Sequence, residues 1–352
     1  MKKGLIIAVI CIICASFLLM IKEFGEVFAI DGQIIGYEIY DEKGNLLTYS
    51  SEVEIGDTIL TRDFVEYQVY KIDGTKCEAR ELRKLHKPSV SARKNRSKQS
   101  NMRKICLYMT HNDESYTPSD GYDSVYGAGG IHDVAKRIKS EFEKENIEIV
   151  LDETLHIPHN NSAYSRSSLT ANRLFRDENP DALFDIHRDG VSRKYYLTNF
   201  EGKPYSKIRI VVGKSNPNFE ENYQFAQEVF EKGNELYPWL FLDIYCGKGH
   251  YNQELTPQNL LFEMGTYLIE KEYVLASVPY LTDVLSSVMY TTDEKADMVV
   301  EKDEPVQNED VEVTENKKGG NIAGIVIAGG GLVGLIGYAL ISLFRRRKIQ
   351  VK

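Results

Sequence analysis

The sequence predicts an α/β domain with a mostly parallel sheet and helices on both faces, preceded by a small all-β domain and flanked by two membrane segments. Apolar runs of strand length alternate with segments of helical periodicity over residues 104–290, and longer apolar runs lie near both ends of the chain. With 352 residues, the chain is long enough for one full domain and a smaller one. Its net charge of −9 argues against a nucleic acid as the main partner.

Both ends of the chain have the features of membrane segments. Residues 1–30 begin with two lysines and continue into an uncharged apolar run, which predicts either an N-terminal anchor or a signal peptide. Residues 322–344 form a transmembrane helix in this interpretation, and the basic tail 345–352 follows at once. Because basic residues mark the cytoplasmic side at both ends, we expect the chain between them to lie outside the cell, tied to its membrane.

Residues 31–85 alternate apolar and polar side chains and contain a hairpin pattern around residues 41–45. We expect a small all-β domain there, with the role of a spacer or protein-interaction module, because it has no cluster of residues suited to catalysis. A basic linker over residues 86–103 separates it from the α/β domain at 104–290. An acidic, flexible tether over residues 291–321 leads to the second apolar run.

Strands and helices are expected to alternate along the α/β domain. The apolar runs that predict strands begin at Ile105 and then cover residues 147–151, 182–189, 208–212 and 260–265. Apolar residues at helical spacing run from Ile131 to Phe142 and from Phe225 to Leu236. Another helix is expected to carry the residues from Ser165 to Leu174, and a long final helix follows the last strand. This alternation is typical of a parallel sheet that is covered on both faces.

Metal-ligand residue types follow two of these strands. His111 and Glu114 lie just past the first strand, where a loop can curl so that both side chains reach one cation. Zinc takes nitrogen and oxygen ligands of this kind, and a catalytic zinc site uses three of them and keeps one position open. His187, near the end of the strand 182–189, is the best candidate for the third ligand. Its neighbours Asp185 and Asp189 could fix the tautomer of the imidazole.

Glu263 lies in the third apolar strand, between Phe262 and Met264. An unpaired carboxylate in a buried apolar strand is costly, so it needs either a salt bridge to an arginine or a functional role. We interpret Glu263 as a general base whose pKa is raised by burial and which acts on a water molecule at the metal.

Other candidates carry weaker arguments. Arg166 and Arg188 could bind a substrate carboxylate, because a guanidinium matches that geometry, or they could form structural ion pairs. The remaining histidines in the α/β domain could each replace Glu114 as a ligand; they are His132, His156, His159 and His250.

Four segments together resemble one known family, that of stage II sporulation protein P. They are Thr110–Tyr116, Phe184–Asp189, Tyr251–Leu255 and Phe262–Gly265. The resemblance covers roughly residues 104–290. The family is related to the zinc N-acetylmuramoyl-L-alanine amidases, and its members are described as cutting the amide between lactyl-muramic acid and the stem peptide, and as endopeptidases on cross-links. They act during forespore engulfment, with a lytic transglycosylase and a membrane scaffold.

The resemblance implies an amidase-like fold and roles for individual residues. His111 and His187 would be zinc ligands, and Glu263 would be the catalytic acid/base. The remaining ligand stays open between Glu114 and His132, because the related amidases take theirs from near the first helix. We also assign Asn252, in the third of the four segments, to substrate binding.

The sequence thus leads us to expect a membrane-tethered, extracytoplasmic zinc amidase that remodels peptidoglycan during sporulation. Two alternatives stay open: a zinc carboxypeptidase-like enzyme, in which Arg166 or Arg188 would hold the free carboxylate of its substrate, and a non-catalytic scaffold that binds the cell wall.

Overall fold

The computed structural model of the chain describes residues 36–86, 103–160 and 162–290. The predicted segments 1–30, 291–321, 322–344 and 345–352, and most of the linker 86–103, lie outside the described residues. Within the described ranges, no helix combines the length and the apolar character that crossing a membrane requires.

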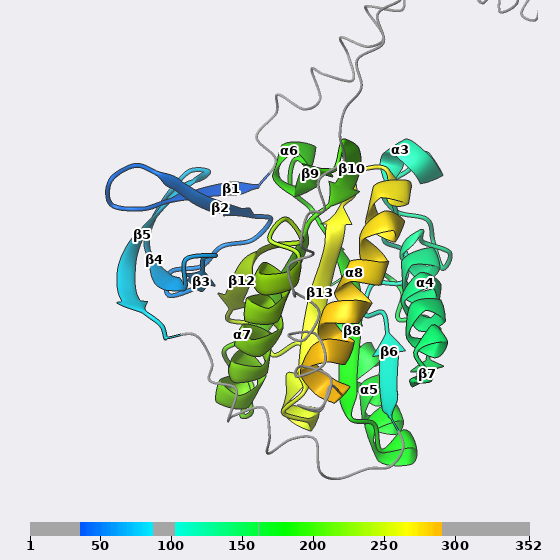
Figure 1. Cartoon of the computed structure of the whole chain (residues 1–352). Coiled ribbons are helices and arrows are strands. Elements are labelled where there is room, and N and C mark those ends of the chain that lie inside the picture. The colour runs from blue at the N-terminus through cyan, green and yellow to red at the C-terminus, as the bar shows by residue number, and fades with distance from the viewer. Residues whose placement is uncertain (1–35, 87–102, 161, 291–352) are drawn as a thin grey trace, which may run out of the picture. The chain divides into compact units, whose positions relative to one another are not determined.

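Eleven strands of the described chain form one sheet, in the order β2-β1-β5-β4-β3-β12-β11-β13-β8-β6-β7 (Figure 1). In chain order, these strands are β1 (Tyr37–Tyr40), β2 (Leu46–Ser50), β3 (Thr58–Leu60), β4 (Val65–Asp73), β5 (Lys76–Lys84), β6 (Lys104–Tyr108), β7 (Glu148–Leu151), β8 (Ala182–Asp189), β11 (Ile208–Gly213), β12 (Phe241–Gly247) and β13 (Asn259–Thr266). The short strands β9 (Leu197–Phe200) and β10 (Lys203–Ser206) pair with each other.

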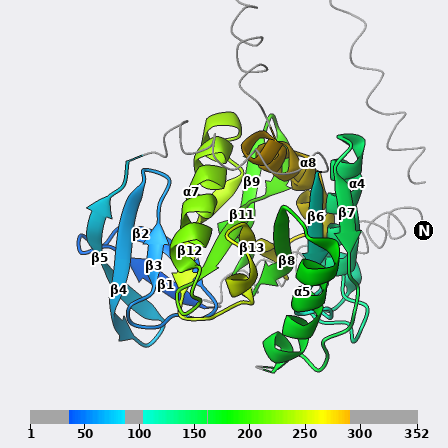
Figure 2. The ribbon, with the colours of Figure 1, turned by 90° about the horizontal axis from the view of Figure 1, so that it is seen from below.

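The helices lie on both faces of the sheet, as the sequence predicts. They are α3 (Thr117–Asp120), α4 (Ile131–Lys144), α5 (Ala163–Glu178), α6 (Arg193–Tyr196), α7 (Phe219–Leu236) and α8 (Lys271–Tyr290), with the 3-10 helix η1 (Gln253–Leu255). α4, α7 and α8 pack over the larger core on one face, whereas α5 lies on the other (Figures 1 and 2). The expected helical spacing holds on α4, where Ile131, Val134, Ile138 and Phe142 are buried.

The prediction of a mostly parallel sheet is wrong, because the sheet is mixed. β7, β6, β8 and β13 are parallel to one another, but β11 runs antiparallel to β13, and β12 runs parallel to β11. A parallel connection needs a crossover of about a dozen residues or more, usually with a helix. The chain between β8 and β11 instead forms the one-turn helix α6 and the β9–β10 hairpin, so β11 begins near the end where β8 finishes and runs back.

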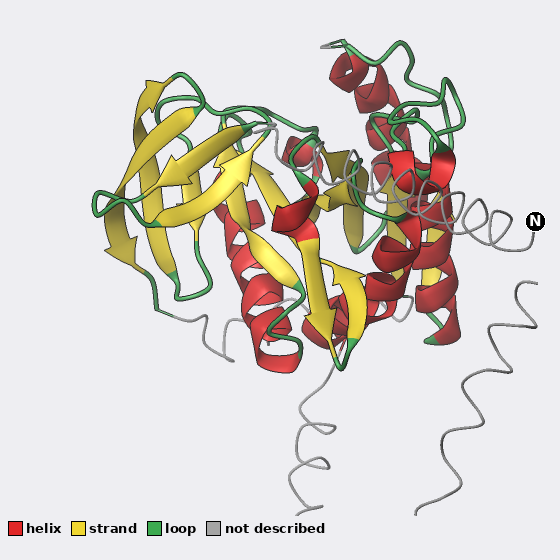
Figure 3. Ribbon diagram, turned by 90° about the horizontal axis from the view of Figure 1, so that it is seen from above, coloured by secondary structure: helices red, strands yellow, loops and turns green. Residues whose placement is uncertain are grey.

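The N-terminal strands β1–β5, called here the β module, extend the same sheet rather than standing apart (Figure 3). β3 pairs antiparallel with β12, and Tyr245 of β12 lies opposite Ile59. The module's own small core includes Ile39, Val69 and Tyr245. A side chain from the central sheet thus completes the packing of the module.

A buried arginine joins the module to the central sheet. Arg209 on β11 is 2% exposed, and its Nε donates to Asp243 Oδ1 at 2.7 Å. Nη1 lies 3.0 Å from Asp189 Oδ2, and Nη2 donates to Thr48 Oγ1 of β2 at 2.8 Å. One guanidinium therefore neutralises two buried carboxylates and anchors β2.

Replacing this arginine is expected to destabilise the protein strongly. Arg209→Met leaves Asp189 and Asp243 buried without their cation, which should lower the free energy of unfolding by about 3–5 kcal/mol. Urea denaturation of the full chain would measure the loss. Arg176→Met is the matched control, because Arg176 is an exposed partner of Asp177 on α5 and its loss should cost less than about 0.5 kcal/mol. Equal effects of the two substitutions would refute the argument.

Candidate active site

Alternation along three neighbouring strands gathers polar side chains on the face of the sheet that carries α5. Side chains alternate between the two faces of a strand, so the even-numbered Phe184, Ile186 and Phe262 enter the large helical core while the odd-numbered residues point to the opposite face. His187 on β8 is the register partner of Glu263 on β13, and Glu263 is the partner of Arg209 on β11. The result is one row of ionisable side chains across the sheet.

The loop after β6 brings His111 and Glu114 to this row. The Glu114 amide donates to His111 O at 3.2 Å, and this turn places His111 Nδ1 3.2 Å from Glu114 Oε1. The other carboxylate oxygen, Oε2, accepts the Arg188 amide at 2.9 Å. Gly129 packs against the loop so closely that a Cβ there would lie 2.3 Å from Glu114 O, which only glycine avoids.

His187 is oriented toward the same point. Its Nδ1 lies 3.6 Å from Glu114 Oε1, and its Nε2 lies 3.0 Å from Asp185 Oδ1. Asp185 is itself held by Thr110, whose amide and hydroxyl donate to it at 2.8 and 2.6 Å. Burial would lower the pKa of His187, but the charges of Asp185 and Glu114 outweigh it and hold that pKa well above its usual range. With a metal bound at Nδ1, the nearby Asp185 carboxylate would keep the remaining proton on Nε2, as in metal-ligating histidines that a carboxylate supports.

A fourth side chain, His159, completes the cluster. Ligand atoms of His111, Glu114 and His159 lie within 4.8 Å of one another. The ring of His159 stacks on that of His111 with centroids 3.9 Å apart, and the His111 and His187 centroids are 4.9 Å apart. Imidazole nitrogens and a carboxylate are the donors that zinc takes in catalytic sites, so these residues fit a zinc ion.

The other histidines weighed as ligands have different partners. His132 Nδ1 lies 3.0 Å from Glu153 Oε1, and the buried His156 contacts Met109 O and Thr170 Oγ1 at 2.8 and 2.9 Å. His250 pairs with Glu254 at 2.9 Å. The structure thus brings Glu114, and not His132, to His111 and His187.

The pKa values of the two carboxyl groups of the site, Glu114 and Glu263, are shifted in opposite directions. Burial would raise the pKa of Glu114, but the neighbouring His187, His111 and Arg188 hold it well below its usual range. Burial raises the pKa of Glu263 well above its usual range, and the nearby charge of Asp189 raises it further. Glu263 Oε2 is buried without a hydrogen-bond partner among the described residues. Two carboxyl groups with separated pKa values are the pattern of a site that divides ligand and acid/base roles.

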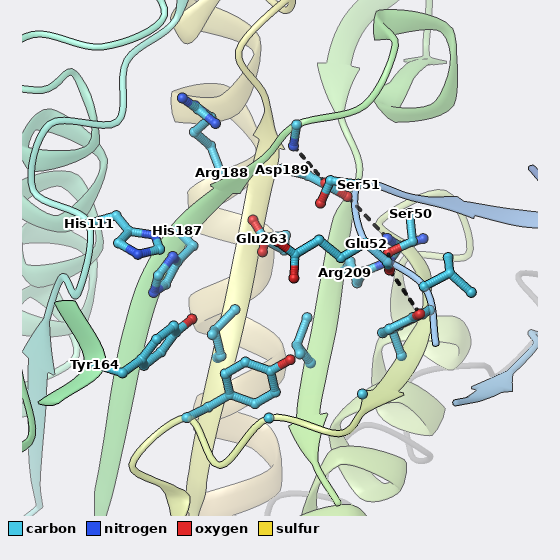
Figure 4. A pocket seen from close by; sticks show the side chains of 18 of the residues that line it. Ser50, Ser51, Glu52, His111, Tyr164, His187, Arg188, Asp189, Arg209 and Glu263 are labelled. Atoms are coloured by element: carbon cyan, nitrogen blue, oxygen red, sulfur yellow. Dashed lines mark hydrogen bonds and ion pairs between the residues drawn. The ribbon is translucent and has the colours of Figure 1, made fainter. Parts of the chain in front are cut away.

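These groups line a cleft of about 680 Å³ (Figure 4). His111 and His187 lie on one side of the cleft, and Ser50, Ser51 and Glu52 of the β module lie on the other, with Glu263 between them. Glu114 and His159 line the cleft beside His111. Tyr164 of α5 closes another side.

The three residues predicted to bind substrate differ in position. Arg188 lines the cleft, and its guanidinium donates to Ser115 O at 3.3 Å and Asp123 O at 2.8 Å. Arg166 is not among the lining residues; its Nε donates to His156 O at 2.9 Å and so holds the 156–160 loop. Asn252 is buried and donates to Ser167 Oγ at 2.9 Å, whereas its neighbour Tyr251 lines the cleft.

Sequence reasoning missed several lining residues. Arg209 could have been found by the argument used for Glu263, because it interrupts the apolar run Ile208–Val212 in the same way. The segment from Ser50 to Asp57 gave no such indication, since only the pairing of β3 with β12 brings it to the cleft.

The fold and the cleft define an α/β protein with a histidine–carboxylate cluster of the kind that binds a metal ion. Residues 33–286 match the family model of stage II sporulation protein P (SpoIIP). The chain therefore belongs to the stage II sporulation protein P family, and the resemblance expected from the sequence is confirmed. Stage II sporulation protein P of Bacillus subtilis (strain 168) is 29% identical over 205 residues, which are 53% of this chain and 51% of that protein. The chain thus spans about half the length of that relative.

Solved structures with some similarity are N-acetylmuramoyl-L-alanine amidases. That of Clostridium difficile 630 is 14% identical, with a TM-score of 0.35, over 58% of this chain and 100% of that chain. The catalytic domain of CwlV from Bacillus (Paenibacillus) polymyxa var. colistinus is 14% identical, with a TM-score of 0.33. The match covers 53% of this chain and 97% of that chain. The CwlD amidase of Clostridioides difficile, solved in complex with the GerS lipoprotein, is 12% identical, with a TM-score of 0.33. The match covers 56% of this chain and 100% of that chain.

Proposed function

We propose that this protein is a zinc-dependent peptidoglycan amidase, an N-acetylmuramoyl-L-alanine amidase that acts on the cell wall in sporulation. One observation carries the proposal: His111, Glu114 and His187 converge in a single cleft beside the buried carboxylate of Glu263. Membership of the stage II sporulation protein P family supports the substrate class.

In this proposal, different residues of the chain bind the metal ion, transfer the proton and orient a ligand. His111, Glu114 and His187 would hold the zinc ion, with His159 beside them as a further donor. Zinc in such a site supplies a Lewis acid for the amide carbonyl and lowers the pKa of water. Glu263 would take the proton of the attacking water and pass it to the leaving amine. Asp185 would keep His187 in the required tautomer.

The carboxypeptidase alternative needs an arginine that is free to bind a substrate carboxylate. Arg166 is engaged by the 156–160 loop, and Arg209 by Asp189 and Asp243. Arg188 lines the cleft, but its guanidinium donates to two backbone carbonyls. These contacts favour an internal amide over a free carboxyl terminus as the group that is cut.

We also propose that the protein is tied to the membrane. Residues 1–30 and 322–344 would tether it, with the cleft on the extracytoplasmic side, where peptidoglycan lies. A lytic transglycosylase and a membrane scaffold of an engulfment complex are the partners we propose, on the strength of the family alone.

A digestion of purified peptidoglycan tests the activity. We expect the full chain in detergent to release free stem peptides when zinc is present and to release none with a chelator; mass spectrometry would identify the new ends. New ends inside the peptide cross-links would make the enzyme an endopeptidase, and loss of terminal residues would make it a carboxypeptidase. If the protein bound peptidoglycan but did not cut it with any metal, its function would be that of a non-catalytic scaffold.

A further inference from the structure

The β module builds one wall of the cleft and is held there firmly. Ser50, Glu52 and Asp57 all line the cavity. The hydroxyl of Tyr245 on β12 donates to Asp57 Oδ2 at 2.7 Å and lies 3.1 Å from Glu52 O, and Ser50 Oγ donates to that carbonyl at 2.6 Å. The backbone of this wall is therefore fixed to the central sheet, and the Glu52 side chain extends from it into the cleft (Figure 4).

Most charged side chains that line the cleft already have a partner of opposite charge or a hydrogen bond. Glu54 pairs with Lys248, and Asp189 pairs with Arg209. Asp57 accepts the Tyr245 hydroxyl. Glu52 differs, because no described residue forms a hydrogen bond or an ion pair with its exposed carboxylate. The wall opposite the histidines thus presents one exposed carboxylate that has no partner among the described residues.

We propose that Glu52 determines specificity by binding a positively charged amino group of the substrate, so that the enzyme prefers stem peptides with a free side-chain ammonium. This inference rests on the proposed function. A substrate that extended from His111 and His187 across Glu263 would meet Glu52, because Glu263 lies between the histidines and the wall of the module. Because Glu52 lies on the side of the cleft opposite the histidines, its carboxylate can select the peptide without taking part in the reaction.

Two muramyl-peptide substrates test the proposal, one with a free side-chain ammonium and one with the same amine acetylated. For the zinc-loaded full chain we expect a kcat/KM about fivefold higher with the free amine, which is the upper range for an exposed ion pair. Glu52→Gln should bring the ratio to about one and leave the acetylated substrate within about twofold of wild type. Glu52→Lys should reverse the preference.

Glu42→Gln is the matched control, because Glu42 is an exposed carboxylate of the same module that does not line the cleft, and it should keep the preference. A wild-type enzyme indifferent to acetylation, or a Glu52→Gln variant that keeps the preference, would overturn the role of Glu52. If wild type cut neither substrate, the proposed function would fail instead. Calorimetric affinities of the two free peptides, compared between wild type and Glu52→Gln, would then still decide whether Glu52 binds the ammonium.

Discussion

A Glu263→Gln variant is expected to lose about 10²- to 10⁴-fold in kcat on peptidoglycan, the range for a general acid–base residue. Glutamine has nearly the same size and shape as glutamate, but its side-chain amide cannot accept a proton at neutral pH. Glu263 Oε2 has no hydrogen-bond partner among the described residues, so the substitution breaks no contact that the fold needs at that atom. The measurement is stem-peptide release by mass spectrometry, together with zinc content and wall binding.

Zinc content and wall binding separate a catalytic from a structural loss. Both should stay at wild-type values in Glu263→Gln, since the residues proposed to hold the zinc ion are others. Glu254→Gln is a suitable control, because Glu254 pairs with His250 and does not line the cleft. If wall turnover by Glu263→Gln equalled that of wild type, the general-base role would be wrong and a binding scaffold would be favoured.

Removing His187 should have the second large effect, on metal affinity. His187→Ala deletes a proposed zinc ligand. Loss of a group that only supports a ligand costs about 10- to 100-fold in metal affinity, so the zinc affinity of His187→Ala should fall by more than that. Asp185→Asn should fall within that smaller range, because it leaves the proposed ligands in place and acts on His187 through the contact with Nε2. Competition with a chromophoric chelator would measure both affinities on the full chain.

The matched control for this series is His132→Ala. His132 is a histidine of the same domain that contacts Glu153 outside the cleft, and its loss should leave the zinc affinity unchanged. The opposite pattern, with zinc lost in His132→Ala and kept in His187→Ala, would mean that the metal is bound elsewhere.

The parts of the site that could be predicted from the sequence are those encoded within single strands. His187 and Glu263 were recognisable because each polar residue interrupts or ends an apolar run, and His111 with Glu114 because they follow such a run directly. Sheet geometry then brings them together, since side chains in register on adjacent strands lie side by side.

The parts that could not be predicted depend on contacts between distant segments. The reversal of β11 follows from the compact α6 and β9–β10 connection, whose length alone does not set its direction. His159 was one of four histidines that the sequence offered as further ligands, and nothing in the sequence singled it out because it reaches the cluster through a loop, which leaves no periodic pattern. The place of the β module in the cleft depends on the pairing of β3 with β12, which lie far apart along the chain.

That pairing has a consequence for where the functional unit begins. A protein cut at residue 104, the start of the predicted α/β domain, would leave β12 as a bare sheet edge, with unpaired amides and carbonyls along Ile244–Cys246. Such edges recruit strands from other chains and promote aggregation. The β module thus acts as a covalently attached cap on the sheet, and the smallest piece that can keep both its solubility and its cleft includes the strands from Tyr37 onward.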